Sequence, residues 1–188
     1  MQLTDKIRSV NRLFSRLDNH EEIFREKAGL ACIPGCGKCC FKPDINATIL
    51  EFLPAAQNMY QSGVYEDILI DMMEKKRNSI CVFYNPDDKE GHCSCYMYRG
   101  LICRLFGFAG RINEYGEKSL VTCKEIRKQI SQSHFAKQLS YAPEITKYYM
   151  KLFSIDPNLS MQQLSVNECI KKAIEIVALD YRYRRKPA

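Results

Sequence analysis

Apolar residues near the start of the chain recur every three or four positions, with charged residues between them. The apolar members of this set are Leu3, Ile7, Val10, Phe14, Leu17 and Phe24. This spacing is typical of an amphipathic helix, and it predicts one helix over residues 2–27 that ends at Gly29. We expect the apolar face to pack on the rest of the chain, with dimerisation through a short coiled coil as the alternative.

The same periodicity returns later in the chain. Residues 48–60 and 65–76 predict two further helices, the first with Pro54 in its early turns or at a kink. Three more are predicted in the C-terminal part, over residues 124–139, 143–154 and 162–184. Helices are therefore expected on both sides of a central region that lacks this pattern.

The central region carries two signals for β structure. Residues 79–84 are rich in β-branched and aromatic side chains and run into a turn-forming sequence at 85–88. Residues 111–121 predict a short hairpin that turns near Gly116 and returns the chain to Cys123.

Most of the ten cysteines lie in this central region. Four of them fall within nine residues, in the sequence Cys32-Ile-Pro-Gly-Cys36-Gly-Lys-Cys39-Cys40. Side chains this close in sequence cannot all enter a packed core, whereas one loop with such spacing can supply several thiolates to zinc or to an iron–sulfur cluster. The glycines between them allow tight and left-handed turns. The other six are Cys81, Cys93, Cys95, Cys103, Cys123 and Cys169.

The expected fold is mainly α, with a helical core built from both ends of the chain. Between them lies a cysteine-rich, loop-dominated metal region with a small β-hairpin. A length of 188 residues suits a single domain over residues 1–188. Within it we distinguish the N-terminal amphipathic helix (1–30), the cysteine-cluster region (31–123) and the C-terminal helices (124–188).

The start of the chain is polar and charged, without the apolar stretch of an export signal. No apolar run approaches the roughly 18 residues of a membrane span. We therefore expect a cytoplasmic protein that does not enter the membrane. In a reducing compartment, ten cysteines favour metal thiolates over disulfides.

The formal net charge of +6 is weak evidence for nucleic-acid binding, because it counts every cysteine as neutral. Each zinc bound by four thiolates adds −2, so two such sites would lower the net charge to +2. Residues 181–186 alternate aromatic and basic side chains, which suits single-stranded nucleic acid but equally a helix C-terminus. We favour the second interpretation, expect no nucleic-acid partner, and leave a protein partner open.

The cysteine spacing resembles that of a known family. The cluster Cys32 to Cys36-Gly-Lys-Cys39-Cys40 resembles the signature of the CxxCxxCC proteins, the YkgJ-type family of zinc- or iron-chelating proteins. The likeness continues at Cys81-Val-Phe and at Cys93-Ser-Cys95-Tyr96-Met-Tyr-Arg99-Gly-Leu-Ile-Cys103-Arg104. There the family pattern is approximately Cys-Ser-Ile-Tyr-x-x-Arg-Pro-x-x-Cys-Arg. The resemblance covers about residues 32–123.

The resemblance implies eight metal-chelating cysteines. By motif position these are Cys32, Cys36, Cys39, Cys40, Cys81, Cys93, Cys103 and Cys123. Cys95 takes the usual aliphatic place and Gly100 the usual proline, so Cys95 is not expected to be a ligand. Three residues separate Cys32 from Cys36, where the family has two.

Eight thiolates complete two four-coordinate sites, for Zn²⁺ or for iron–sulfur clusters. Adjacent Cys39 and Cys40 leave the backbone in different directions, so they serve two sites more easily than one. The spacings match neither zinc fingers nor ferredoxins, and their unequal distribution favours an iron–sulfur cluster over zinc.

Three polar residues lie between or beside the predicted ligands: Tyr96, Arg99 and Arg104. We expect them to supply cations and hydrogen-bond donors that stabilise thiolate sulfur, with ordinary surface charge as the alternative for the two arginines. His92, next to Cys93, is an alternative ligand.

Functions from three classes are compatible with these patterns. The leading hypothesis is a metal-binding protein, with a redox role if it holds iron–sulfur and a structural role if it holds zinc. The second is an enzyme or enzyme accessory with an open-iron cluster in SAM-linked protein modification, because Cys32, Cys36 and Cys39 have the spacing of a radical-SAM triad. Against it, no run of βα units is predicted. The third is a zinc-stabilised nucleic-acid-binding protein. No catalytic residue is indicated.

Overall fold

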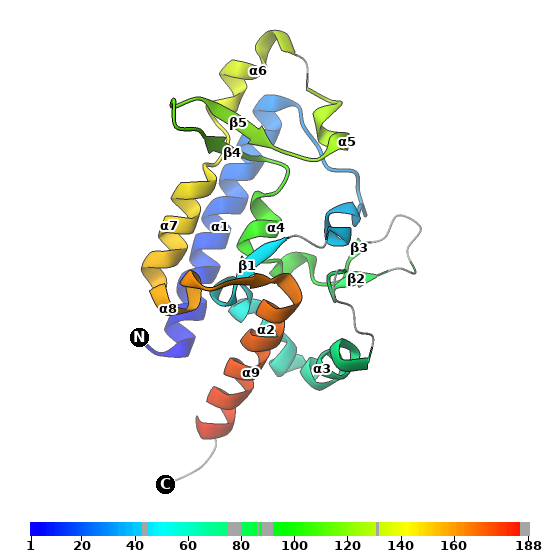
Figure 1. Ribbon diagram of the computed structural model, residues 1–188, viewed down its shortest axis with the longest axis vertical. Helices are drawn as coiled ribbons and strands as arrows, with labels where there is room; N and C mark the ends of the chain where they lie inside the picture. Colours follow the sequence, from blue (N-terminus) through cyan, green and yellow to red (C-terminus); the bar gives the residue numbers. More distant parts are fainter. Residues whose placement is uncertain (43–44, 75–79, 86, 88–91, 131, 185–188) are drawn as a thin grey trace.

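The N-terminal helix α1 runs from Leu3 to Ala28 and ends at Gly29, whose φ of 63° is the left-handed conformation of a helix C-cap. The computed structural model describes residues 1–42, 45–74, 80–85, 87, 92–130 and 132–184 (Figure 1). Five of the six predicted apolar positions of α1 are buried, and Leu3 packs against the core from its edge. The first predicted helix is confirmed.

The remaining elements follow in chain order, with 3₁₀ turns labelled η. Up to the middle of the chain these are η1 (Lys38–Phe41), β1 (Asn46–Thr48), α2 (Ile49–Ser62), α3 (Tyr65–Glu74), β2 (Tyr84–Asn85), β3 (His92–Cys93), η2 (Tyr96–Tyr98) and α4 (Leu101–Leu105). The second half holds β4 (Ala109–Ile112), β5 (Lys118–Val121), α5 (Lys124–Arg127), α6 (Gln132–Leu139), α7 (Ile145–Ile155), α8 (Pro157–Met161), β6 (Gln163–Ser165) and α9 (Val166–Arg184).

The main core forms where helices from the two ends of the chain meet. Helix α1 contacts α2, α4 and α7, and α2 packs along α9 (Figure 1). Leu17 of α1, Leu53 of α2 and Ile174 of α9 are fully buried members of this core, so each helix hides an apolar stripe from water. Pro54 lies inside α2 without ending it, as predicted.

A second, smaller core lies at the other end of α1. It comprises Phe24, Leu30, Phe108, Ile126 and Ala142. The hairpin of β4 and β5 lies at this end, together with α5 and α6 (Figure 1). Its register pairs Arg111 with Ser119, and Gly116 in the turn has a φ of 81°, so the predicted hairpin is confirmed.

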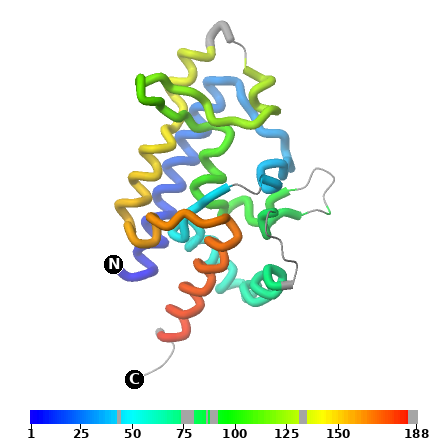
Figure 2. Tube along the Cα trace, viewed as in Figure 1, coloured from blue at the N-terminus to red at the C-terminus, as the bar shows by residue number. Residues whose placement is uncertain are grey.

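Three short antiparallel strand pairs complete the described fold: β1 with β6, β2 with β3, and β4 with β5. The pairing of β2 with β3 was not predicted, and neither was the first pair. It pairs Asn46 with Ser165, and the trace in Figure 2 shows these distant segments side by side. In the described part of the chain the strands form no βα run of the kind a conventional radical-SAM fold needs.

Other boundaries differ from the sequence-based prediction. Residues 163–165 form a strand, so the last helix begins at Val166 and not at 162. The helix predicted over 124–139 is divided into α5 and α6, with residue 131 outside the described part. Of the strand predicted over 79–84, only Tyr84 is in β structure and residue 79 is not described. Helix α3 is described as far as Glu74, so the predicted end at 76 lies outside the described residues.

The chain is mainly α with small hairpins, as predicted. Among the described residues, no helix combines the length and apolar character required to cross a bilayer.

Candidate metal centre

The cysteine loop leaves α1 and turns back on itself. The N–H of Cys36 donates to the Ile33 carbonyl at 3.1 Å, around Gly35 with a φ of 75°. Gly37 has a φ of −102°, so of the two glycines only Gly35 uses the left-handed conformation expected for this loop. The turn η1 follows and holds the adjacent pair Cys39 and Cys40.

A backbone hydrogen bond joins this loop to the segment with Cys81. The Cys81 N–H donates to the Cys40 carbonyl at 3.1 Å. The side chain of Asn167, from the first turn of α9, accepts from the Val82 N–H at 2.9 Å and donates to the Ile80 carbonyl at 2.8 Å. The side-chain amide of Asn167 thus takes the hydrogen bonds that a neighbouring strand would make to the backbone of residues 80–82. This explains why these residues do not form the predicted strand.

Cys93 reaches the same place through the short pair of β2 and β3. Its backbone partner in this ladder is Tyr84. Ser94 then donates to the Phe83 carbonyl through both its N–H, at 2.8 Å, and its hydroxyl, at 3.0 Å. The two chain segments that carry Cys81 and Cys93 are therefore fixed against each other.

Cys103 lies in α4, and a buried carboxylate fixes the start of that helix. The fully buried Glu51 accepts from the Ile102 N–H at 2.8 Å, and from the N–H and hydroxyl of Thr48 at 2.7 and 3.1 Å. Thr48 and Glu51 form a capping box at the start of α2. Burial raises the pKa of Glu51 to about 7, although these donors oppose the rise.

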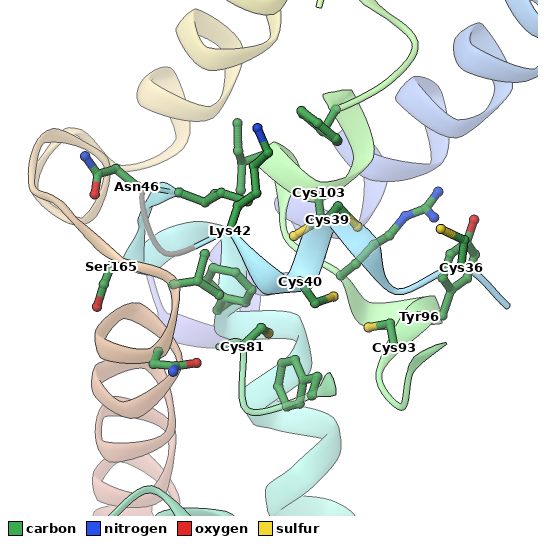
Figure 3. Close-up of a pocket in the computed structure, with 18 residues that line it drawn as sticks. Cys36, Cys39, Cys40, Lys42, Asn46, Cys81, Cys93, Tyr96, Cys103 and Ser165 are labelled. Atoms are coloured by element: carbon green, nitrogen blue, oxygen red, sulfur yellow. The ribbon is translucent and has the colours of Figure 1, made fainter. Parts of the chain in front are cut away.

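Six cysteines line one cavity of about 260 Å³. They are Cys36, Cys39, Cys40, Cys81, Cys93 and Cys103. The rest of the wall is largely apolar and includes Phe52, Phe83 and Ile102. Figure 3 shows the cysteines approaching this space from separate segments, with Asn46 and Ser165 at the opposite end from Cys36. Cysteines up to 67 positions apart thus meet at one place.

Cys40 is the centre of a group of neighbouring thiols. Its thiol interacts with the neighbouring thiols of Cys39, Cys81 and Cys93. The contact with Cys40 lowers the pKa of Cys39 and of Cys93, whereas the same contacts raise the pKa of Cys40. Burial and the nearby Cys81 raise the pKa of Cys103. A thiophilic metal replaces protons shared in this way, so the donor set fits thiolate coordination.

Cys32 and Cys123 lie outside the described lining of the cavity but close to its Cys36 side. Cys32 is exposed as a whole residue, but partial burial of its thiol raises its pKa, and neighbouring Cys36, Cys39 and Cys123 raise it further. The side chain of Gln129 ties this corner together, because it accepts from the Ala31 N–H at 2.9 Å and donates to the Ala31 carbonyl at 2.9 Å. Gln129 follows α5, whose N-cap is Cys123.

All ten cysteines are free thiols. Within the described residues, no three cysteine, histidine or carboxylate side chains already form a closed metal-coordinating group. The sulfurs surround a space, and the closing of four of them on a metal needs local adjustment of these loops.

The polar residues predicted beside the ligands occupy different places. Arg99 lines the cavity, with its guanidinium carbon 4.0 Å from the centre of the Tyr96 ring, and Tyr96 lines it as well. Arg104 is buried and is bound elsewhere: it donates to Asp18 of α1 and to the Met97 carbonyl at 2.7 Å. Its described hydrogen bonds thus join α4 and the η2 turn to α1.

The two cysteines left out of the predicted ligand set also differ from each other. Cys95 is half-buried near Cys93, and burial raises its pKa to about 12. Cys169 is fully buried in α9, and burial raises its pKa to about 12. Its sulfur lies 3.8 Å from the Leu164 carbonyl, in the packed main core.

The aromatic residues of the C-terminal helix are partly used in packing. Tyr181 stacks on Tyr60 with ring centres 4.6 Å apart, and its hydroxyl accepts from Gln57 at 3.2 Å. One face of this ring is therefore used in packing within the chain. Tyr183 is exposed, and residues 185–186 of the predicted basic tail lie outside the described part.

Comparison with protein-family models matches residues 31–135 to CxxCxxCC, described as a "putative zinc- or iron-chelating domain". The match spans more than half of the chain. The chain belongs to the CxxCxxCC family. Comparisons with curated proteins and with solved structures gave no match. The family assignment made from the cysteine motif is confirmed, and with it the coarse function of zinc or iron chelation.

Several residues that build the site were not predicted. Glu51, Gln129 and Asn167 hold the cysteine segments through side-chain contacts with the backbone. For Glu51 the sequence carried a signal, because Thr48-x-x-Glu51 ahead of an apolar run is a capping-box pattern. Gln129 and Asn167 carried none, since a lone amide in a helical region looks like a solvated residue.

Proposed function

We propose that this chain binds metal through eight thiolates arranged as two adjacent groups of four. The first group is Cys40, Cys81, Cys93 and Cys103, and the second is Cys32, Cys36, Cys39 and Cys123. The observation that carries the proposal is the cavity lined by six of these eight cysteines, with Cys40 beside three other thiols.

The division follows the neighbours of each thiol. Cys40 and Cys103 both have Cys81 and Cys93 nearby. Cys32 has Cys36, Cys39 and Cys123 around it. Cys39 is close to members of both sets, and its place next to Cys40 in η1 puts the two groups side by side.

We propose iron–sulfur as the occupant of these groups. A single zinc ion draws four sulfurs to about 2.3 Å from one point. Six of the eight proposed ligands, including all four of the first group, line a cavity of about 260 Å³, a space that suits a cluster of several atoms bound by four cysteines. Such a centre supports an electron-transfer or redox role in the cytoplasm, where free thiols stay reduced. Zinc in the same groups would instead give a purely structural centre.

The test is the metal content of anaerobically purified protein. We expect broad visible absorption, with iron and acid-labile sulfide by chemical analysis. A colourless protein with two zinc ions per chain would support the two thiolate groups but contradict iron–sulfur as their occupant. A chain that binds neither metal would reject the proposal as a whole.

Serine variants test the division into groups. Cys40→Ser should lose the metal of the first group and Cys36→Ser that of the second, each retaining about half of the total. Cys95→Ser is the matched control, because Cys95 is a half-buried neighbour outside both groups. Full metal content in both Cys40→Ser and Cys36→Ser would contradict the assignment.

A further inference from the structure

A buried carboxylate of α1 lies between two arginines beside the cysteine cavity. Glu21 is only 4% exposed. One of its oxygens lies 3.7 Å from Nη1 of Arg25, and the other lies 3.7 Å from Nη2 of Arg99. These three residues line a hollow next to the cavity, together with Tyr96 and Asp18.

This charged group is poorly explained as a device for stability. Oε2 of Glu21, Nε of Arg25 and Nε of Arg99 are buried without a hydrogen-bond partner in the described structure. Buried charges with incomplete hydrogen bonding cost free energy relative to apolar packing. Burial raises the pKa of Glu21, and the two arginines oppose that rise. A perturbed charged group of this kind at a cavity wall is a candidate for a functional role.

Each arginine held by Glu21 has cysteines among its charged neighbours. Arg99 lines the cavity and is a charged neighbour of Cys39 and Cys93, one from each proposed group. Arg25 is a charged neighbour of Cys32 in the second group. Metals bound by four thiolates carry net negative charge, which nearby guanidinium groups offset. A single carboxylate therefore holds positive charge beside both groups.

We infer that Glu21 is a positioning residue of the metal centre, which holds Arg99 and Arg25 against the two cysteine groups. Helix α1 lies outside the matched region 31–135, so this part of the centre is not contained in the family domain. The inference rests on the proposed function, because the charge to be offset is that of the bound metal and its thiolates.

The first experiment compares Glu21→Gln with Glu22→Gln in the full chain, carrying the metal with which it is purified. Glu22 lines the same hollow but is exposed, so it controls for the loss of a negative charge at this place in the same helix. The rate of metal transfer to EDTA is measured by elemental analysis of desalted protein. Metal transfer should be about tenfold faster in Glu21→Gln and unchanged in Glu22→Gln. Equal rates in the two variants would overturn the inference.

A second measurement separates positioning from the direct effect of the Glu21 charge. In the Co²⁺-loaded chain, withdrawal of a guanidinium from the sulfurs lowers the energy of the sulfur-to-cobalt charge-transfer band. Glu21→Gln and Arg99→Gln should therefore shift the band in the same direction. A shift of opposite sign would mean that Glu21 acts only through its own negative charge, and the inference would fail.

The double variant supplies the third comparison. If Glu21 acts through Arg99, then Glu21→Gln combined with Arg99→Gln should release metal within about twofold of Arg99→Gln alone. Fully multiplicative effects would contradict this coupling. Should Glu21→Gln fail to fold, Arg99→Gln tests the same idea. If Arg99→Gln releases metal at the native rate, Arg99 does not stabilise the bound metal, and the inference that Glu21 positions it for that purpose fails.

The outcomes distinguish this inference from the function on which it rests. A native chain that holds no metal under anaerobic purification defeats the proposed function. A native chain that holds metal, with Glu21→Gln behaving like Glu22→Gln, defeats only the role of Glu21.

Discussion

Glu51 accepts a hydrogen bond from the Ile102 N–H at 2.8 Å, and so connects the first turn of α2 to the first turn of α4. Because Cys103 is the next residue, a fully buried carboxylate fixes the backbone of a proposed ligand. The same carboxylate caps α2 through Thr48. One side chain thus serves both the main core and the cysteine cavity.

Replacement of Glu51 by Gln should destabilise the chain. Glutamine has only one acceptor oxygen, whereas both oxygens of Glu51 accept from backbone N–H groups, of Thr48 and of Ile102. The NH₂ group of the glutamine would therefore leave one of these two N–H groups without an acceptor. We expect a loss of about 2 kcal/mol in the free energy of unfolding, measured by urea denaturation. Glu66→Gln, at an exposed position in α3, is the control and should change stability by less than about 0.5 kcal/mol. Equal effects would show that the Ile102 contact is dispensable.

Gly100 stands where the family pattern has proline, and Phe52 explains the difference. The backbone of Gly100, with a φ of −66°, would accept proline, but a Cβ there would lie 2.7 Å from Cζ of Phe52. Gly100→Pro should therefore cost about 1–3 kcal/mol of stability.

Phe52→Leu should relieve this clash. We expect the double variant Gly100→Pro with Phe52→Leu to be more stable than the sum of the two single effects, by thermal or urea unfolding. Strictly additive effects would mean that the ring of Phe52 is not what excludes a side chain at position 100.

Gln129 should matter for one cysteine group and not for the other. Gln129→Ala removes both hydrogen bonds to Ala31, which adjoins Cys32. We expect metal in the second group to be released about tenfold faster, with the first group unchanged. Two-phase release to EDTA measures both rates. Gln61→Ala, which removes an exposed amide far from the cysteines, should leave both phases as they are.

The ion pair between Asp156 and Lys6 should make stability depend on acid pH. Burial would raise the pKa of Asp156, but Lys6 at 2.5 Å and the Leu159 N–H at 3.1 Å together hold it below the ordinary value. A carboxyl group whose pKa is lowered in the folded state contributes its full stabilisation of the fold at pH values above its unfolded-state pKa, near 4. That contribution is lost as the pH falls through the folded-state pKa.

Asp156→Asn should consequently lose about 1 kcal/mol at pH 7, and little at pH 3. Urea denaturation at both pH values gives the difference. Asp5→Asn is the control, since Asp5 pairs with Arg8 in a largely exposed bridge. A loss for Asp156→Asn that is the same at both pH values would contradict the assignment to this ion pair.

The sequence predicted the parts of the fold that depend on local patterns. The apolar spacing of α1 and the turn at Gly116 were enough to place a long helix and a hairpin. The crowded cysteines predicted the family, and the structure gathers six of the eight proposed ligands around one cavity.

What the sequence could not supply depends on contacts between distant residues. The pairing of β1 with β6 involves three residues on each side, too few for any periodic signal. The segment 80–82 looks like a strand in composition, but Asn167 binds its backbone groups instead. Glu21 resembles any charged residue on a helix surface, and only the fold reveals that it is buried between two arginines.

The pairing of Asn46 with Ser165 has a consequence for the order in which the chain is made. These residues are roughly 120 positions apart, which at ~5–20 residues per second is on the order of ten seconds of translation. Throughout that interval the cysteine loop has already been synthesised, while Ser165, Val166 and Asn167 of the cavity wall do not yet exist. The complete centre can therefore be assembled only on the finished chain, and its thiols must stay reduced until then.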